Sequence, residues 1–211
     1  MPTTRKERAA ETEAALKAAA KRVFGARGYL NTKITDITAE AGRAAGSFYN
    51  HFPSKEALLE ALLADMLAAG DAATLDPQHT ADFTDRASIR WQVATFWGVY
   101  RAHLPVFVAL REAAMVDPVF RARLREISAA DDRHFAGHLA GVRHLPGPPH
   151  LVISAFRALL DQFAWQWLAA GGDGSGPAPS DDEAIELLTT ILHSGIAGAA
   201  EANPAMPPRL R

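Results

Sequence analysis

Apolar residues recur at intervals of three and four positions along almost the whole chain, and this spacing constrains its fold most strongly. Leu16, Ala20, Val23 and Phe24 show it clearly near the N-terminus. Such a period places apolar side chains on one face of an α-helix, whereas a half-buried strand requires strict alternation. No alternating segment is long enough to predict a strand. We therefore expect an all-α fold of about nine helices.

Glycines and capping residues divide the N-terminal part of this pattern into four helices. Gly28 and Gly42 mark the ends of the first two helices. Asn31 and Thr32 offer a side-chain cap for the second helix, and Ser54 offers one for the fourth. The later helices are expected around residues 86–103, 105–115, 118–142, 150–170 and 181–201.

Charge is distributed unevenly along the chain. Residues 1–56 hold ten Lys and Arg against six Asp and Glu, whereas the remaining residues hold twelve against eighteen. A basic N-terminal quarter on an acidic body is typical of a polyanion-binding module attached to a second domain. Arg5, Lys6 and Arg8 allow two interpretations, a solvated tail or a basic arm that follows a DNA backbone.

Several classes of protein are disfavoured by what the sequence lacks. It contains no cysteine, which excludes disulfides and thiolate chemistry and favours a reducing cytoplasm. Its longest uncharged apolar stretch, residues 187–200, is shorter than the ~18 residues of a membrane span, so we expect a buried helix there. Asp131, His134 and His138 share one side of a helix and could hold a divalent metal, but a surface histidine pair is far commoner. We expect no metal, no cofactor and no enzymatic activity.

The second and third helices are short, joined by a tight glycine turn and braced by a longer helix on each side. This is the plan of a helix-turn-helix, here formed by roughly residues 32–52. Phe48 and Phe52 lie four apart on the third helix and are expected to pack inward. Gly46 lies inside that helix at a cost of ~1 kcal/mol relative to alanine, which is explained if another surface approaches closely.

A dense run of residues within positions 12–63 follows a known pattern. Its members are Phe24, Gly28, Thr32, Asp36-Ile37, Ala41-Gly42, Gly46-Ser47-Phe48-Tyr49, His51-Phe52 and Ser54-Lys55-Glu56-Ala57-Leu58-Leu59. The pattern resembles the TetR family of bacterial transcriptional regulators. The resemblance implies a homodimer with an N-terminal DNA-binding domain and a divergent helical C-terminal domain that binds a small molecule. We place the DNA-binding domain at residues 1–56 and the ligand-binding and dimerisation domain at residues 57–211.

Five residues are expected to dock this domain on the DNA backbone. By the resemblance, Tyr49, His51 and Lys55 contact phosphates. Lys55 lies in the first turn of its helix, where the helix dipole disfavours a cation unless a phosphate arrives there. Thr32 and Lys33 repeat this arrangement at the second helix. Two alternatives stay open, that Tyr49 is a core aromatic and that His51 is simply exposed.

The residues available to read bases are few and depart from the family pattern. Arg43 stands where a small apolar turn residue is usual, and Ala44 stands where a serine or threonine usually caps the recognition helix. Ala45 replaces a residue that is often polar. Base contacts are therefore expected from Arg43, Ser47 and Asn50, with methyl contacts from Ala44 or Ala45 to thymine. DNA binding is predicted, whereas the operator sequence is not.

Aromatic residues gather in the second half, where eleven of the seventeen lie between Trp91 and Trp167. They form either an ordinary core or an apolar cavity in which polar groups orient a small apolar or amphipathic ligand. The candidate ligand-binding residues are Gln92, Phe96, Trp97, Tyr100, Phe107, Arg111, Phe120, Phe135 and Phe163.

The last two helices are apolar over most of their circumference, which predicts burial on two sides. We expect them to form an isologous four-helix dimer interface. The candidate interface residues are Phe156, Leu160, Phe163, Trp167, Leu188, Leu192, Gly195 and Ala199. Such a dimer presents two recognition helices to successive major grooves, roughly 34–36 Å apart.

Together these features predict a homodimeric, cytoplasmic repressor that a small-molecule ligand releases from double-stranded DNA. Ligand binding would favour a conformer whose recognition helices no longer match the groove spacing. Two alternatives remain open. One is a DNA-organising or transcription-activating member of the family. The other is a ligand-binding or enzymatic helical protein with a vestigial N-terminal domain, which Ala44 and Ala45 leave possible.

Overall fold

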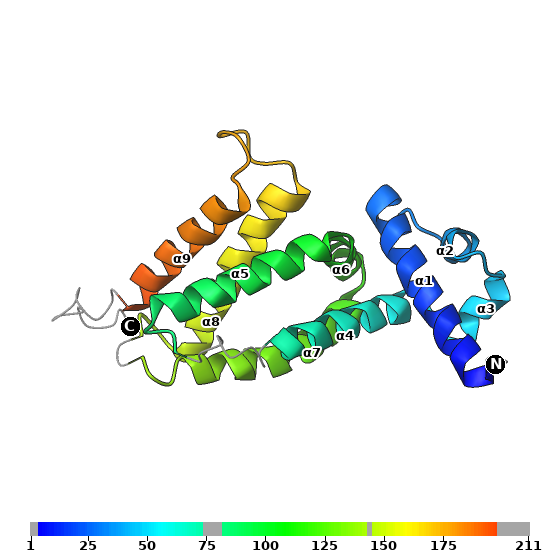
Figure 1. The fold of residues 1–211 in the computed structure, drawn as a ribbon, viewed down its shortest axis with the longest axis horizontal. Coiled ribbons are helices and arrows are strands. Elements are labelled where there is room, and N and C mark those ends of the chain that lie inside the picture. The colour runs from blue at the N-terminus through cyan, green and yellow to red at the C-terminus, as the bar shows by residue number, and fades with distance from the viewer. Residues whose placement is uncertain (1–3, 74–81, 143–144, 198–211) are drawn as a thin grey trace. The chain divides into compact units, whose positions relative to one another are not determined.

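The computed structural model describes residues 4–73, 82–142 and 145–197, with side chains described except in 69–73, 130–135 and 196–197. These residues form α-helices and one short π-helical segment, and no strand occurs among them (Figure 1). The prediction of an all-α fold is confirmed. The helices are α1 Arg5–Arg27, α2 Ile34–Glu40, α3 Ala45–Tyr49, α4 Lys55–Ala73, α5 Arg86–Ala102, α6 Leu104–Val116, α7 Pro118–His138, α8 Pro149–Ala164, η1 Trp165–Ala169 and α9 Asp181–Ala197.

The chain divides into two compact units. The first unit consists of Met1–Asp71 and Ala102–Ile127, and the second of Ala72–Arg101 and Ser128–Arg211. The packing therefore groups α6 and the first half of α7 with the N-terminal helices. The functional boundary expected after residue 56 stays a prediction.

Helix α1 begins with a reciprocal cap. Thr4 Oγ1 accepts a hydrogen bond from the Glu7 N–H at 3.2 Å, and the Glu7 carboxylate accepts one from the Thr4 N–H at 2.6 Å. Arg5, Lys6 and Arg8 consequently lie in the first turns of α1. They are therefore helical and not a solvated tail, and their contact with a DNA backbone stays a prediction.

The core of the first unit follows the predicted apolar faces. Leu16 and Phe24 of α1 are buried, as is Ile37 of α2. Phe48 and Phe52 pack on the same core with ring centroids 5.7 Å apart, as expected from their spacing. Ser54 caps α4, since its Oγ accepts a hydrogen bond from the Ala57 N–H at 3.2 Å.

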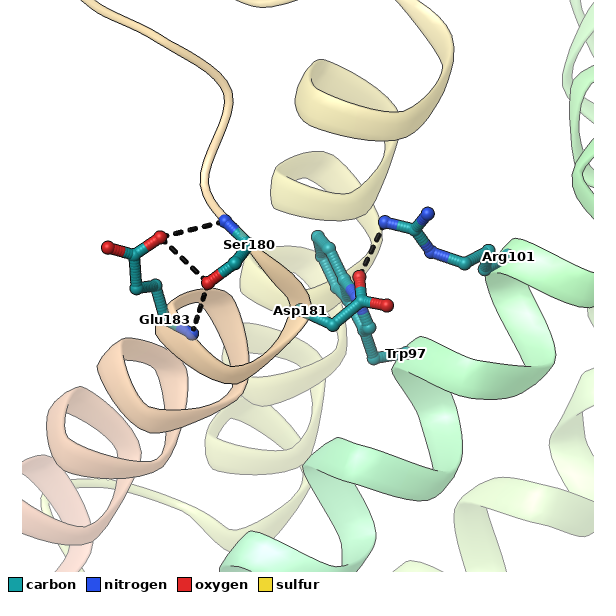
Figure 2. A network of polar contacts seen from close by, with 5 residues as sticks. All are labelled: Trp97, Arg101, Ser180, Asp181 and Glu183. Atoms are coloured by element: carbon teal, nitrogen blue, oxygen red, sulfur yellow. Dashed lines mark hydrogen bonds and ion pairs between the residues drawn. The ribbon is translucent and has the colours of Figure 1, made fainter.

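In the second unit, α9 is bound to α5 by polar contacts. Asp181 accepts hydrogen bonds from the Trp97 indole at 2.7 Å and from the Arg101 guanidinium at 2.5 Å (Figure 2). Ser180 and Glu183 complete the network with a capping box at the start of α9 (Figure 2). Further along α9, Glu186 forms ion pairs with arginines of α5. The two helices are therefore held together by charged contacts at several points.

Candidate nucleic-acid interface

The turn between α2 and α3 is built on glycine. Gly42 has φ 62°, in the left-handed region that residues with a Cβ adopt only at a cost. Its N–H donates to the Ala39 carbonyl at 3.1 Å, and the Arg43 N–H donates to the Thr38 carbonyl at 2.9 Å. These bonds satisfy the end of α2 and set the direction in which α3 leaves.

Helix α3 has one buried face and one open face. Phe48 is fully buried, whereas Ala44, Ala45 and Asn50 are exposed and Ser47 is half-buried. A Cβ placed on Gly46 would meet no atom within 4 Å. The start of this helix thus presents small side chains to solvent, which leaves room for a large partner to approach the backbone.

The expected cap of α2 is corrected by the structure. The Thr32 side chain is buried, and its hydroxyl donates to the Gly28 carbonyl at 2.7 Å. The Asn31 side chain donates to the Arg27 carbonyl. Both residues therefore close the end of α1 instead of opening α2. Lys33 occupies the N-cap position, and its N–H donates to the Asp36 carboxylate at 2.8 Å.

The two candidate docking lysines lie in different environments. Lys33 is exposed. The Lys55 ammonium instead donates to the carbonyls of Tyr29 and Thr32, both at 2.8 Å, and lies 3.9 Å from the centroid of the Tyr29 ring. Burial lowers the pKa of Lys55, although neighbouring carboxylates act in the opposite direction. Lys55 therefore ties α4 to the turn between α1 and α2, and its contact with a phosphate stays a prediction.

Tyr29 connects this turn to α4 a second time. Its hydroxyl donates to the Glu56 carboxylate at 2.7 Å. Burial raises the pKa of Tyr29, and the bond to Glu56 raises it further, because both favour the neutral phenol. Burial alone would raise the pKa of Glu56, but the hydrogen bond from Tyr29 and others lower it overall. The sequence pattern did not single out Tyr29, because nothing near it in the chain distinguishes it from a core aromatic.

The remaining docking and reading candidates are placed as follows. Tyr49 is 60% exposed and contacts Phe48 edge-on, so it is not a core aromatic. His51 is half-buried. Arg43 leans towards α1, where its guanidinium lies 3.7 Å from the Glu11 carboxylate. Base contact by Arg43 stays a prediction.

The ligand-binding candidates are distributed over both units. In the second unit, Trp97 and Tyr100 are buried and Phe96 is partly exposed, with the Phe96 and Tyr100 ring centroids 5.7 Å apart. Gln92 Oε1 is buried and has no hydrogen-bond partner among the described residues. Phe163 lies 6.0 Å from Trp97, between ring centroids. The side chain of Phe135 lies outside the described residues.

In the first unit, Phe107 and Arg111 are partly exposed on α6, and Phe120 is buried on α7. A groove of about 690 Å³ in the second unit is lined by other residues. These are Ser128, Ala136, Pro149, His150, Ile153, Ser154 and Arg157. No sequence signal pointed to this groove, because its lining is not aromatic.

The expected dimer-interface residues lie in different environments within one chain, and their place in an interface stays a prediction. Phe156, Leu160, Leu188 and Leu192 are each at most 7% exposed and belong to the core of a single chain. Phe163 and Trp167 are half-buried, Gly195 is exposed, and Ala199 lies outside the described residues. These four side chains therefore pack within a single chain.

A second apolar stripe of the same helices remains exposed. Leu151 on α8 is 55% exposed, and Leu187 and Ile191 on α9 are 48% and 47% exposed. Ala155 and Ala158 continue the exposed face of α8 at helical spacing. Leu187 and Ile191 belong to residues 187–200, which were expected to form a buried helix. Within one chain these two side chains are exposed, so the expectation is wrong for this face of α9.

Other classes of site receive no support from the described part of the chain. No group of three or more His, Asp or Glu residues is placed to hold a metal among the residues searched. His138 is buried edge-on against Phe83, with ring centroids 5.0 Å apart, whereas the side chains of Asp131 and His134 lie outside the described residues. No single described helix is long and apolar enough to cross a membrane. Helices α5 and α6 reach that length only together, with a bend at the break between them.

The geometry of α1 to α4 defines a helix-turn-helix domain, and comparison with known proteins agrees. Residues 16–62 match the family described as bacterial regulatory proteins, tetR family. The chain is 27% identical over 111 residues to the HTH-type transcriptional regulator EthR of Mycolicibacterium smegmatis, covering 53% of this chain and 51% of EthR. It is 45% identical over 58 residues to the HTH-type transcriptional regulator TtgR of Pseudomonas putida, covering 28% of each chain. The match thus spans about half the length of EthR and less of TtgR.

The fold is similar over a longer range. A TetR-like transcriptional regulator from Rhodococcus sp. RHA1 superimposes with a TM-score of 0.68 at 21% identity, covering 93% of this chain and all of that one. Residues 16–62 are therefore similar to the tetR family of bacterial regulatory proteins, and α1 to α4 have helix-turn-helix geometry. The chain as a whole has the fold of TetR-like regulators.

Proposed function

We propose that the protein is a homodimeric DNA-binding transcriptional regulator whose hold on DNA responds to a small ligand. The open face of α3 carries this proposal. It combines a buried Phe48, which fixes the helix, with small exposed residues and a glycine that no other part of the described chain covers. A helix of this kind fits the major groove, where backbone and small side chains approach base edges closely.

The docking contacts are assigned to residues that are both polar and accessible. Lys33 and Tyr49 are exposed at the two ends of the helix-turn-helix and suit phosphate contacts, with His51 beside them. Thr32 and Lys55 stabilise the turn between α1 and α2 next to this surface, because their polar groups bind backbone carbonyls there. The base-reading set remains Arg43, Ser47 and Asn50 with the methyl groups of Ala44 and Ala45.

We assign the dimer interface to the exposed stripes of α8 and α9. Leu151, Leu187 and Ile191 present apolar surface that a second copy would bury, and the alanines of α8 permit close approach. An isologous interface of two helices from each subunit results. Such a dimer would present two recognition helices to successive half-sites on DNA.

The ligand proposal rests on α5. Gln92 and Phe96 lie four apart on this helix, and the buried Gln92 oxygen is an acceptor that a ligand donor group could satisfy. Trp97 and Tyr100 extend the aromatic surroundings. We therefore expect a small apolar or amphipathic ligand with at least one hydrogen-bond donor, which shifts the protein towards a conformer with lower DNA affinity.

The test is selection of bound fragments from the source genome with the purified full chain, followed by anisotropy titrations at several salt concentrations. A regulator gives a few promoter-proximal sites and specific binding that weakens with salt. Binding at many unrelated sites would favour a DNA-organising role. A chain that shows no salt-dependent association with any fragment would refute the proposal in favour of a ligand-binding protein with a vestigial domain.

A further inference from the structure

We infer that Glu112 is a positioning residue for DNA binding, through which α6 holds the turn between α1 and α2 in its binding-competent shape. The inference rests on the proposed function. It concerns a residue that lies outside the helix-turn-helix and far from it in the sequence.

The contact itself is a carboxylate bound to two consecutive backbone N–H groups. Glu112 Oε2 accepts a hydrogen bond from the Tyr29 N–H at 2.7 Å and from the Leu30 N–H at 3.2 Å. Both donors lie in the turn after α1, outside any helix. Hydrogen bonds to an ionised acceptor are shorter and stronger than those between neutral groups, so one side chain fixes two residues of the turn.

The surrounding residues are arranged so that this carboxylate can approach. A Cβ on Gly28 would stand 3.2 Å and 3.3 Å from the two Glu112 oxygens, and Gly28 also has φ 75°. At the start of α6, a Cβ on Gly25 would stand 3.2 Å from the Pro105 ring. Gly25 within α1 and Gly28 at its end thus leave room for α6 at two points. These points, Pro105 and Glu112, lie about two turns apart along α6.

The same turn is held from its other polar side by Lys55. Glu112 binds the N–H groups of Tyr29 and Leu30, whereas Lys55 binds the carbonyls of Tyr29 and Thr32. The turn is therefore clamped between an anion on α6 and a cation on α4. Because Lys33, a candidate phosphate contact, directly follows this turn, removal of the clamp would let Lys33 and the start of α2 shift.

The test uses the full chain with Glu112→Ala, Glu112→Gln and a matched control, Glu126→Gln, which removes an exposed carboxylate of α7 that pairs only with Arg123 among the described contacts. DNA affinity is measured by anisotropy over a salt series, and amide hydrogen exchange is followed at Tyr29 and Leu30. In wild-type protein these two turn amides are expected to be protected, since the carboxylate binds them.

We expect Glu112→Ala to lose this protection and to weaken DNA binding by about tenfold or more. Glu112→Gln should recover most of the affinity, because its amide oxygen can accept the same two N–H groups. The salt dependence should stay unchanged in Glu112→Gln. In Glu112→Ala the displaced Lys33 should lose its phosphate contact, so the salt slope should fall by about 0.9. Glu126→Gln should behave as wild type.

Three results would overturn the inference. One is fast exchange of the Tyr29 and Leu30 amides in wild-type protein, which needs no variant to fold. Another is a folded Glu112→Ala protein that binds DNA like wild type. The third is a loss of affinity in Glu112→Gln as large as that in Glu112→Ala. If wild-type protein binds no DNA at all, the proposed function fails. The exchange data then show separately whether Glu112 binds the Tyr29 and Leu30 amides.

Discussion

Replacing Lys55 with methionine distinguishes a lysine that docks DNA from one that supports the docking surface. Methionine keeps most of the side-chain length and apolar stem but removes the ammonium. In the structure that ammonium donates to two carbonyls at 2.8 Å and lies over the Tyr29 ring. We therefore expect the substitution to destabilise the first unit.

The magnitude follows from the two hydrogen bonds that the substitution removes. A hydrogen bond from a charged donor contributes about 1.5–3 kcal/mol. Two such bonds set an upper range, which solvent screening at this partly exposed position reduces. We expect the free energy of unfolding to fall by about 2 kcal/mol. For a chain of this size that corresponds to a fall in Tm of about 4–8 °C.

The assay combines thermal unfolding at fixed protein concentration with DNA anisotropy over a salt series. The matched control is Lys33→Met, which removes an exposed lysine. Lys33→Met should leave Tm unchanged and reduce the salt slope by about 0.9 for each phosphate that is no longer neutralised. Lys55→Met should lower Tm and leave the salt slope unchanged. A Lys55→Met protein with wild-type Tm and a reduced salt slope would refute the structural role assigned to this lysine.

Three further predictions concern other parts of the chain. Gly46→Ala should stabilise the protein by about 0.5–1 kcal/mol in thermal unfolding but weaken DNA binding at least about tenfold, because the added methyl occupies space that DNA enters; unchanged affinity would show that this face does not meet DNA. Leu187→Glu with Ile191→Glu should yield monomers in sedimentation experiments, whereas Met115→Glu, at a residue 74% exposed elsewhere, should not; a double variant that remains dimeric would exclude the α9 face. Burial and a nearby lysine lower the pKa of His103 below its usual 6.5, so the free energy of unfolding should fall as the pH drops below about 6.5, and His103→Gln should reduce this fall in urea titrations; an identical pH dependence in the variant would contradict this.

Local signals in the sequence were sufficient for the helix-turn-helix itself. Gly42 adopts the backbone conformation that only glycine takes at low cost, and Ser54 caps α4 through its own hydroxyl. Phe48 and Phe52 are buried as their spacing indicates. Each of these properties depends on residues within a few positions, so a short segment of the chain is enough to predict it.

The roles of Lys55 and Glu112 could not be predicted in the same way. Their partners are backbone groups in the turn after α1, and in the case of Glu112 those groups lie 82 and 83 positions away. The apolar stripes of α8 and α9 present a related difficulty. Both sides of each helix are apolar, so the sequence alone did not indicate which side a single chain buries.

The contact between Trp97 and Asp181 gives the protein an intrinsic optical probe. The indole is 2% exposed, and its N–H is bound to a carboxylate that Arg101 shares at the first residue of α9. Indole emission depends on the charge and polarity beside the ring, so any displacement of α9 from α5 should alter the fluorescence of Trp97. Candidate ligands can therefore be screened on unlabelled protein in which the other three tryptophans are replaced by phenylalanine, with Asp181→Asn as the reference for a weakened contact.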